Sequence, residues 1–422
     1  MHAPASLPTP TKRRCGEREI VALLAGLMAM NALALDTMLP ALPAIGAELG
    51  IVQANAQQYV IVAYMMGFGA SQLFWGPLAD RYGRKRVLTL GISGYIAFGI
   101  LAAAARDFTL LIAARFLMGA CGSVSRILVL AIVRDLYEGE RMARVMSLTY
   151  MVFMVVPVVA PSLGQLILLG GNWRLIFWML VAYGVVLLAW GTIRLPETLK
   201  PEFRRAIEIR TILEGFKGAL IDRLSIGYTL ALGTVFLTLV AYLASVQQIV
   251  GDTFGRPEAI GWVFAAVAAP MSLASWGNSR IVERIGLRTA GHGGLVLFLV
   301  ATTSHFLWHM MVGSTLLSFT LFMSAALTAF AFTTANFGTL AMTNMAPIAG
   351  TASSVQGAIG TVMAAVLGLI VGQAYDGTVG PFVMGLLCSS VGAMAIVLWT
   401  ERGRLFAKRD EEPPELRGPV RE

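Results

Sequence analysis

Residues 76–86 read Gly76-Pro-Leu-Ala-Asp80-Arg81-Tyr82-Gly83-Arg84-Lys85-Arg86 and connect two long apolar runs. Five of these residues are charged, and glycines stand at positions 76 and 83. Membrane helices are apolar over roughly 20 residues, and their cytoplasmic connections collect lysine and arginine. The stretch therefore indicates a membrane protein with many spans, and its positive charge indicates that this connection faces the cytoplasm.

The composition indicates that lipid surrounds most of the chain. Of the 422 residues, 57% are hydrophobic and 13% are charged, against roughly 25% charged in globular domains. The mean hydropathy is +0.72. The first apolar run, from about Ile20 to Leu39, is too long for a signal peptide and lacks a small-residue cleavage site. We expect it to be retained as the first span.

Apolar runs of about 20 residues predict twelve spans. The fold class is therefore an all-α integral membrane protein with twelve transmembrane helices. The predicted spans are 20–40, 57–78, 87–105, 108–133, 143–169, 173–193, 224–249, 259–279, 289–309, 312–336, 350–373 and 379–400.

Lysine and arginine predict the orientation of these spans. Of the 32 basic residues, 27 fall in segments that share one side if the N-terminus lies inside. The opposite loops carry only Arg106, Arg174 and Arg256. The positive-inside rule then places both termini in the cytoplasm. The same split explains the net charge of +8 without a nucleic-acid partner.

A long charged connection at 194–223 separates two sets of six spans. It has an apolar periodicity that predicts an amphipathic helix at the membrane surface. Trp75-Gly76 followed by Arg81-Tyr-Gly83 has an echo in Trp276-Gly277 followed by Arg284-Ile-Gly286. We expect two six-helix bundles of inverted three-helix repeats. The predicted divisions are an arm at 1–19, bundles at 20–193 and 224–400, the linker at 194–223 and a tail at 401–422.

Several motifs together resemble the major facilitator superfamily (MFS), and within it the twelve-span drug:proton antiporters of the Bcr/CflA type. The loop at 76–86 is similar to the signature loop of the superfamily. The other matching segments are Leu35-Asp36-Thr-Met-Leu-Pro40, Arg115 with Gly119, Arg134-Asp135-Leu-Tyr137, Pro157-Val-Val-Ala-Pro161-Ser-Leu-Gly164, Leu195-Pro-Glu197-Thr198-Leu199 and Ala349-Gly350-Thr-Ala-Ser-Ser354. The resemblance implies transport by alternating access, with no cofactor and no metal.

Charged side chains inside spans are costly and are candidates for function. Asp36 is the one carboxylate placed deep in a predicted span, roughly 24 Å from its cytoplasmic start. Arg115 lies roughly 12 Å from the outer end of its span, so the two could share one level of a cavity. Arg126 is about three helical turns from Arg115 on nearly the same face. We expect these three residues to take part in proton or substrate coupling, which links proton movement to transport.

Each of these residues also has a structural alternative. Asp36 could cap helix-end groups near Pro40. Arg115 could bind backbone carbonyls, although the resemblance places a functional arginine there. Arg126 could extend toward the cytoplasmic interface.

The resemblance implies that Gly76, Asp80, Arg81, Gly83, Arg84 and Lys85 form an intracellular gate. A carboxylate is stabilised at the positive N-terminal end of a helix. We expect Asp80 to meet the start of the span at Gly350, which would favour an outward-open state. The alternative is a charge cluster that only sets the topology.

Pro157, Pro161 and Gly164 correspond to the antiporter motif of the fifth span and are expected to kink it. Ordinary helix packing is the alternative. The candidates for lining an adaptable cavity are Tyr64, Met118, Tyr150, Met154, Tyr242, Phe332, Asn336 and Gln356. Each of them could equally face lipid or the protein core. No nucleotide-binding or catalytic pattern is visible, so we expect no enzyme.

The sequence thus predicts a monomeric transporter in the cytoplasmic (inner) membrane of a bacterium, which exports small amphipathic drugs against protons. The alternatives are a proton-coupled uptake symporter or metabolite exporter of the same fold, and more remotely a membrane sensor that transports nothing. A membrane-embedded enzyme is disfavoured because no nucleophile stands beside the deep carboxylate.

Overall fold

The computed structural model describes residues 16–137, 139–199, 202, 204, 209–345 and 348–406. Within these ranges it contains helices and no strand, and twelve of the helices have 20 or more residues. These are α1 Glu17–Asp36, α3 Tyr59–Tyr82, α4 Arg84–Ala103, α5 Phe108–Leu136, α6 Gly139–Leu168, α7 Arg174–Arg194, α9 Arg223–Gln248, α10 Ile260–Ile285, α11 Leu287–Val312, α12 Leu316–Ala341, α13 Ala349–Gln373 and α14 Gly380–Thr400. The predicted all-α architecture with twelve long helices is confirmed.

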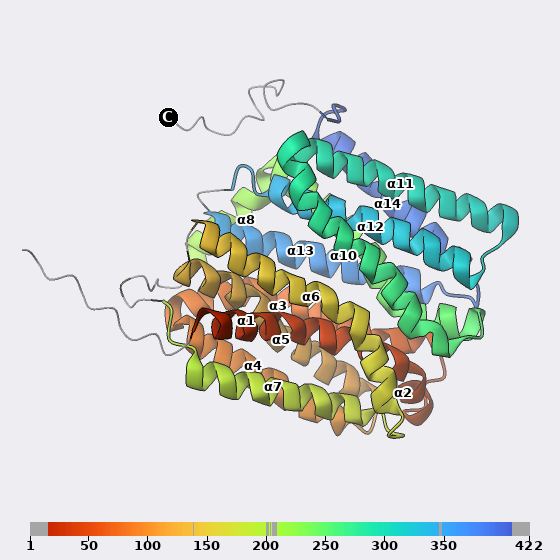
Figure 1. Ribbon diagram of the computed structural model, residues 1–422, viewed down its shortest axis with the longest axis horizontal. Helices are drawn as coiled ribbons and strands as arrows, with labels where there is room; N and C mark the ends of the chain where they lie inside the picture. The colour runs from red at the N-terminus through yellow and green to blue at the C-terminus, as the bar shows by residue number, and fades with distance from the viewer. Residues whose placement is uncertain are drawn as a thin grey trace, which may run out of the picture.

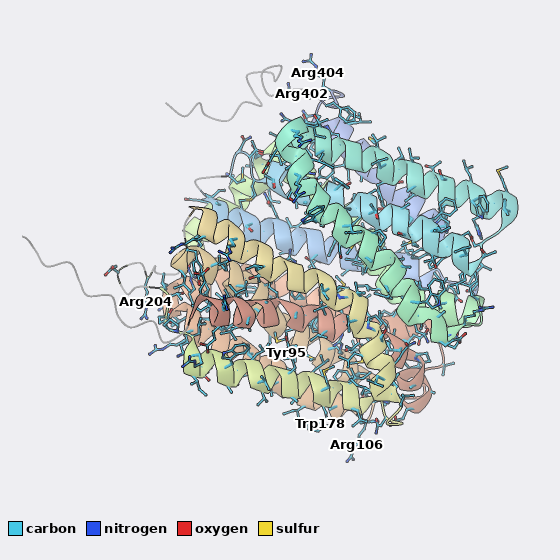
Figure 2. The ribbon with its side chains drawn as sticks, viewed as in Figure 1. Tyr95, Arg106, Trp178, Arg204, Arg402 and Arg404 are labelled. Atoms are coloured by element: carbon cyan, nitrogen blue, oxygen red, sulfur yellow. The ribbon has the colours of Figure 1, made fainter. Side chains whose placement is uncertain are left out.

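The helix exteriors suit a lipid environment. In the described part of the chain, ten helical stretches are long and apolar enough to cross a membrane. Large apolar side chains remain exposed on their outer faces, among them Phe74, Leu169, Leu297, Met311 and Leu321. Exposed apolar area on this scale is unfavourable in water and expected in lipid. Figure 2 shows Trp178 among these outward side chains, whereas Tyr95 lies between the helices.

The helices pack as two groups that meet along a seam. On one side α3 and α4 pack on α5, α4 packs on α7, and α1 packs on α6. On the other side α9 packs on α13 and α14, α11 on α12 and α14, and α10 on α12. The seam is formed chiefly by α3 with α13 and by α6 with α10. We call the two groups the N-half and the C-half.

Short helices mark the two ends of this bundle (Figure 1). The α2 end carries η1 Leu39–Ala41, α2 Leu42–Glu48, η2 Ala54–Gln58, the π-helical turn η4 Ile249–Thr253 and η5 Pro257–Ala259. The α8 end carries α8, Ile209–Ile221, within the stretch predicted as an amphipathic linker. Ala219 of α8 packs with Ala352 and Val355 of α13 in a buried apolar cluster. Residues 1–15 of the predicted arm at 1–19, parts of the linker, and residues 407–422 of the predicted tail lie outside the described residues.

The first long helix ends four residues earlier than predicted. The sequence predicted residues 20–40, but α1 ends at Asp36. The hydroxyl of Thr37 donates to the carbonyl of Leu33 at 2.6 Å, and Pro40 has no N–H with which to continue the α-helix. The chain then turns through η1 into α2. Asp36 therefore lies at a helix end rather than within the last turns of a longer helix.

Gly83 and Gly286 belong to the two copies of the sequence repeat, and both form the same kind of turn. Each is the single residue between two long helices, with φ of 96° and 85°. Side chains rarely adopt this backbone region, so glycine is favoured at both positions. Equivalent turns therefore occupy matching places in the two halves.

Candidate functional site

Asp36 lies at the end of α1, where the N-half meets the C-half. Its side chain is 4% exposed, and within the described ranges it forms no hydrogen bond or ion pair. The hydroxyl of Tyr242 in α9 lies within electrostatic range of this carboxyl, across the seam. Buried carboxylates are normally paired or hydrogen-bonded. Asp36 is thus a buried acid whose partner must be a proton, a water molecule, a substrate or a rearranged side chain.

The α6 helix fixes the position of this acid. A Cβ atom on Gly164 would lie 2.2 Å from the carbonyl oxygen of Thr37, the residue after Asp36. Only glycine lets α6 approach so closely. Pro157 and Pro161 lie inside the same continuous helix, and Figure 1 shows α6 turning toward α2 over its last part. Gly164 of the predicted antiporter motif therefore supports the end of α1.

Arg115 is fully buried and binds backbone rather than Asp36. Its Nε donates to the carbonyl of Val60 at 3.0 Å, and its Nη2 donates to the carbonyl of Ala34 at 3.1 Å. The guanidinium also lies 4.5 Å from the centre of the Tyr64 ring. Arg115 thus ties α5 to α1 and α3, two residues before Asp36. This arrangement matches the structural alternative that the sequence left open, and no ion pair joins the two charges in this conformation.

Arg126 has a different setting from Arg115, although both lie on α5. Its side chain is exposed, and its guanidinium lies 5.9 Å from the ring of Phe68. The structure therefore separates the three predicted coupling residues into a buried acid, a buried cation and an exposed cation.

Sequence reasoning missed Asn31, which lies on α1 five residues before Asp36. Its Oδ1 accepts from Tyr64 at 2.7 Å, and its Nδ2 donates to the hydroxyl of Ser125 at 2.8 Å. The sequence feature that could have revealed Asn31 is its place as a polar residue inside an apolar span. These two hydrogen bonds link α1 to α3 and α5, five residues before Asp36 on α1.

The signature loop forms an ion network at the α8 end. Arg84 is 4% exposed, and its guanidinium contacts Asp80 at 2.6 Å and Asp135 at 3.1 Å. The carboxylate of Glu197 accepts from the backbone N–H groups of Arg84 at 2.8 Å and Lys85 at 3.2 Å. Glu197 therefore caps the N-terminus of α4, where a negative charge is stabilised.

The expected contact between Asp80 and the start of α13 is not formed in this conformation, within the described residues. Asp80 turns to Arg84 instead, and Arg81 lies over the ring of Tyr82 at 5.2 Å. Gly76 brings α3 near α13, since a Cβ atom there would lie 3.6 Å from the hydroxyl of Ser354. The motif residues are therefore gathered within the N-half, next to the seam.

The C-half contains a related cluster that the sequence did not reveal. Arg288, just after Gly286, contacts Glu401 at the end of α14 at 3.1 Å. Tyr228 donates to Glu401, and its hydroxyl lies 2.9 Å from Nε2 of His292. Arg84 with Glu197 and Arg288 with Glu401 thus occupy corresponding places after the two glycine turns.

A set of four amide side chains joins the halves at the α2 end. Nε2 of Gln58 donates to Gln248 at 2.6 Å and to the carbonyl of Gly372 at 2.9 Å. Gln248 donates to Asn55 at 2.9 Å, and Gln373 donates to Gln58 at 3.1 Å. Asn55 also donates to the carbonyls of Gln373 and Tyr375. We call Asn55, Gln58, Gln248 and Gln373 the amide interlock.

The remaining predicted cavity residues do not gather at one place. Tyr64 and Met118 are buried beside Arg115. Asn336 donates to Asn278 at 2.8 Å and Gln356 donates to Ser225 at 2.8 Å, both within the C-half. Phe332 lies next to Gly294 in the same half. The side chains of Tyr150 and Met154 lie outside the described part.

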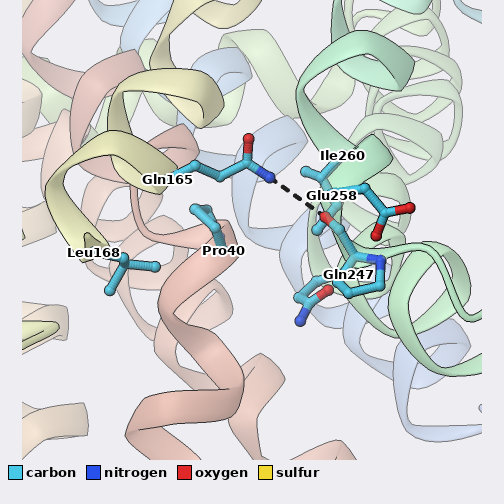
Figure 3. A pocket seen from close by; sticks show the side chains of 7 residues that line it. Pro40, Gln165, Leu168, Gln247, Glu258 and Ile260 are labelled. Atoms are coloured by element: carbon cyan, nitrogen blue, oxygen red, sulfur yellow. Dashed lines mark hydrogen bonds between the residues drawn. The ribbon is translucent and has the colours of Figure 1, made fainter. Parts of the chain in front are cut away.

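Two cavities open at the α2 end. One of about 330 Å³ lies between the halves and is lined by Pro40, Gln165, Leu168, Gln247, Pro257, Glu258 and Ile260 (Figure 3). Gln165 crosses it to the carbonyl of Pro257 at 3.3 Å. The other, of about 590 Å³, lies over the amide interlock and is lined by Gln53, Asn55, Asp252, Gln373, Tyr375, Asp376 and Gly377.

Comparison with known proteins gives consistent relatives. A family model described as Major Facilitator Superfamily matches residues 24–369. The chain is 27% identical over 378 residues to the bicyclomycin resistance protein homolog of Haemophilus influenzae, covering 87% of this chain and 92% of that one. It is 32% identical over 274 residues to the MFS-type transporter YdgK of Bacillus subtilis, covering 64% and 67%. A shorter match, 35% over 164 residues, covers 39% of this chain and 42% of the multidrug resistance protein MdtL of Escherichia coli.

Solved structures share the fold at low sequence identity. A D-xylose–proton symporter superimposes with a TM-score of 0.70 at 12% identity, covering 90% of this chain and 96% of that one. The human organic anion transporter MFSD10 gives 0.64 at 18% identity, covering 92% and 99%.

Proposed function

Because the chain belongs to the Major Facilitator Superfamily, we propose that it is a secondary transporter that exports small amphipathic compounds in exchange for protons. It is a multi-pass membrane protein with bacterial relatives, and it is a transporter rather than an enzyme. Two relatives are named for resistance to bicyclomycin and to multiple drugs, which supports export as the direction and drugs as the substrate class.

One observation carries the proposed proton coupling. Asp36 is a deeply buried carboxylate without a hydrogen-bond partner in the described ranges, and it lies at the seam that must open and close during alternating access. Burial disfavours a charged carboxylate, so an acid at this position can exchange its proton when the surroundings change. Arg115 holds the carbonyl of Ala34 and so links the coupling site to α5.

The arrangement supports a conformation that is closed at the α2 end. The amide interlock holds the halves together there. Asp80, at the α8 end, is bound within its own half, and Arg126 is exposed ten residues before the end of α5. In our proposal the α8 end faces the cytoplasm with both termini, and substrate enters from that side. Docking of Asp80 on α13 would close that end in the opposite state.

The proposed division of the chain into segments fits this alternation between two conformations. Two six-helix bundles at 20–193 and 224–400 move against each other, and the linker at 194–223 connects them, between an N-terminal arm at 1–19 and a tail at 401–422. The protein works as a monomer in the inner membrane, and protons are its second substrate. Nucleic acid plays no part.

Replacing Asp36 tests the proposal. Asp36→Asn should abolish proton-driven export, because an amide keeps the shape of the side chain but cannot exchange a proton. The protein is expressed in an efflux-deficient bacterium that is screened for drug susceptibility, and export is then measured in inverted vesicles with an imposed pH gradient. Asp107→Asn is the matched control, since Asp107 caps α5 and asparagine caps helices equally well.

Two results of this experiment would contradict the proposal. One is full proton-driven export by the Asp36→Asn protein at normal abundance. The other is uptake rather than export under the same gradient, which would indicate a symporter.

A further inference from the structure

Two hydroxyl groups of α9 are buried without partners. Tyr242 and Ser245 are each 1% exposed, and neither hydroxyl has a hydrogen-bond partner in the described ranges. They are three residues apart and so lie on neighbouring positions of one helix face. Leaving a buried hydroxyl unpaired costs roughly 1–3 kcal/mol. Such groups therefore call for a specific explanation, such as a missing water, ion or substrate.

The packing of α9 holds Tyr242 at the seam opposite Asp36. The hydroxyl of Tyr242 lies within electrostatic range of the Asp36 carboxyl, and Val240 on the same helix packs against Val62 and Met65 of the N-half, which places α9 at the seam. The ring of Tyr242 lies 5.1 Å from that of Phe264 in α10, which fixes its orientation. The α9 helix also contacts η1, the turn that begins shortly after Asp36. The tyrosine therefore reaches the acid from the C-half.

We propose that Tyr242 is the hydrogen-bonding partner that the C-half offers to Asp36. The proposal rests on the proposed role of Asp36 and extends it. The two side chains are not directly bonded in this conformation. One water molecule between them, held also by Ser245, or a small approach of the halves, completes the contact. Asp36 would then have a partner across the seam.

The chemistry of this pair couples protonation to the seam. A tyrosine hydroxyl donates to an ionised carboxylate, and it donates to the carbonyl oxygen of a protonated one. The bond to the ionised form is charge-assisted and about twice as strong. Protonation of Asp36 therefore weakens a contact between the halves. This gives the proton a direct effect on the equilibrium between the two conformations.

Few other charged or titratable groups face Asp36. The α5 helix brings Arg115, which is bound to the carbonyls of Val60 and Ala34. The α7 helix carries Tyr183, but its hydroxyl donates to the carbonyl of Gly26, ten residues before Asp36 on α1. The part of α6 at 155–168 has no titratable side chain. On the C-half side, Glu258 lines the cavity beside Pro40 but is exposed. Among the described residues, Tyr242 is thus a buried group on the C-half side, and its hydroxyl has no hydrogen-bond partner.

Infrared spectroscopy of the purified full-length protein tests the pair without any substrate. The carbonyl band of protonated Asp36 is identified as the band that Asp36→Asn removes from a pH titration. Tyr242→Phe should raise the frequency of this band, because its oxygen loses a hydrogen bond. The midpoint of its titration should move up by about one pH unit, since a bond to the ionised form is lost.

Tyr95→Phe is the matched control. Tyr95 is also fully buried with an unpaired hydroxyl, but it lies on α4 inside the N-half, and Asp36 is not among the charges that act on it. The control should leave the band and its midpoint unchanged. An unchanged band in Tyr242→Phe, an equal shift in Tyr95→Phe, or the absence of any Asp36 band would overturn the proposal. Because no transport is measured, these results are independent of whether Asp36→Asn abolishes export.

Discussion

Single glycines decide where the charged groups of this protein can lie. Gly164 lets α6 reach the carbonyl of Thr37 and so supports the end of α1 beside Asp36. Gly83 lets the carboxylate of Glu197 reach the first N–H groups of α4. In both places the functional residue is an acid, and the glycine determines what can stand next to it.

Gly83→Ala should destabilise the protein more than Gly286→Ala. Both glycines have positive φ, so alanine costs about 1–3 kcal/mol in backbone strain at each. At Gly83 the new Cβ would also lie 2.5 Å from a Glu197 oxygen, whereas nothing lies within 4 Å of a Cβ at Gly286. Thermal unfolding of the two variants in detergent measures the difference. Equal losses of stability would show that Glu197 moves away at no cost.

At the scale of helices, sequence patterns predicted local features well and distant contacts poorly. Apolar runs predicted all twelve long helices, because each run alone determines a span. The end of α1 was placed too late, since hydrophobicity continues past Asp36 although the helix does not. The amide interlock was missed because Asn55, Gln58, Gln248 and Gln373 are ordinary polar residues in their own segments. Only the packing of α3 on α13 and α9 brings them together.

Gln58→Leu should favour opening at the α2 end. The substitution removes three hydrogen bonds: those that Gln58 donates to Gln248 and to the carbonyl of Gly372, and the one that it accepts from Gln373. Each bond contributes about 1 kcal/mol. Loss of three such bonds, about 3 kcal/mol in all, changes a population ratio by a factor of roughly 100. The three native cysteines are first replaced. Spin labels at Val52→Cys and Arg256→Cys, one in each half, then measure the distance across this end.

Gln57→Leu provides the comparison for that experiment. Gln57 is the neighbour of Gln58 in η2 and is 7% exposed, but it forms none of the bonds of the interlock. It should leave the distance distribution as in the parent protein. A Gln58→Leu distribution that matches the parent would mean that apolar packing along α3 and α13 closes this end.

At the scale of the whole molecule, the two halves repeat one design with different chemistry. Each has a glycine turn that is followed by an arginine, and a glutamate after the last helix of that half binds this arginine. Glu197 accepts from the backbone N–H of Arg84, and Glu401 pairs with the side chain of Arg288. The side chain of Arg84 binds Asp80 and Asp135. The acid that we assign to coupling, Asp36, also lies in the N-half. The C-half supplies hydroxyl and amide groups to the seam.

The orientation of the molecule in the membrane follows from this arrangement and can be measured. The basic segments lie with α8, so the α8 end should face the cytoplasm. Val52 at the α2 end is 98% exposed and Ile221 at the end of α8 is 69% exposed. In a background without the three native cysteines, a membrane-impermeant maleimide should label Val52→Cys in intact cells. It should label Ile221→Cys only after the inner membrane is permeabilised. The reverse pattern would place the signature loop outside the cell, where Asp80 and α13 could not form a cytoplasmic gate.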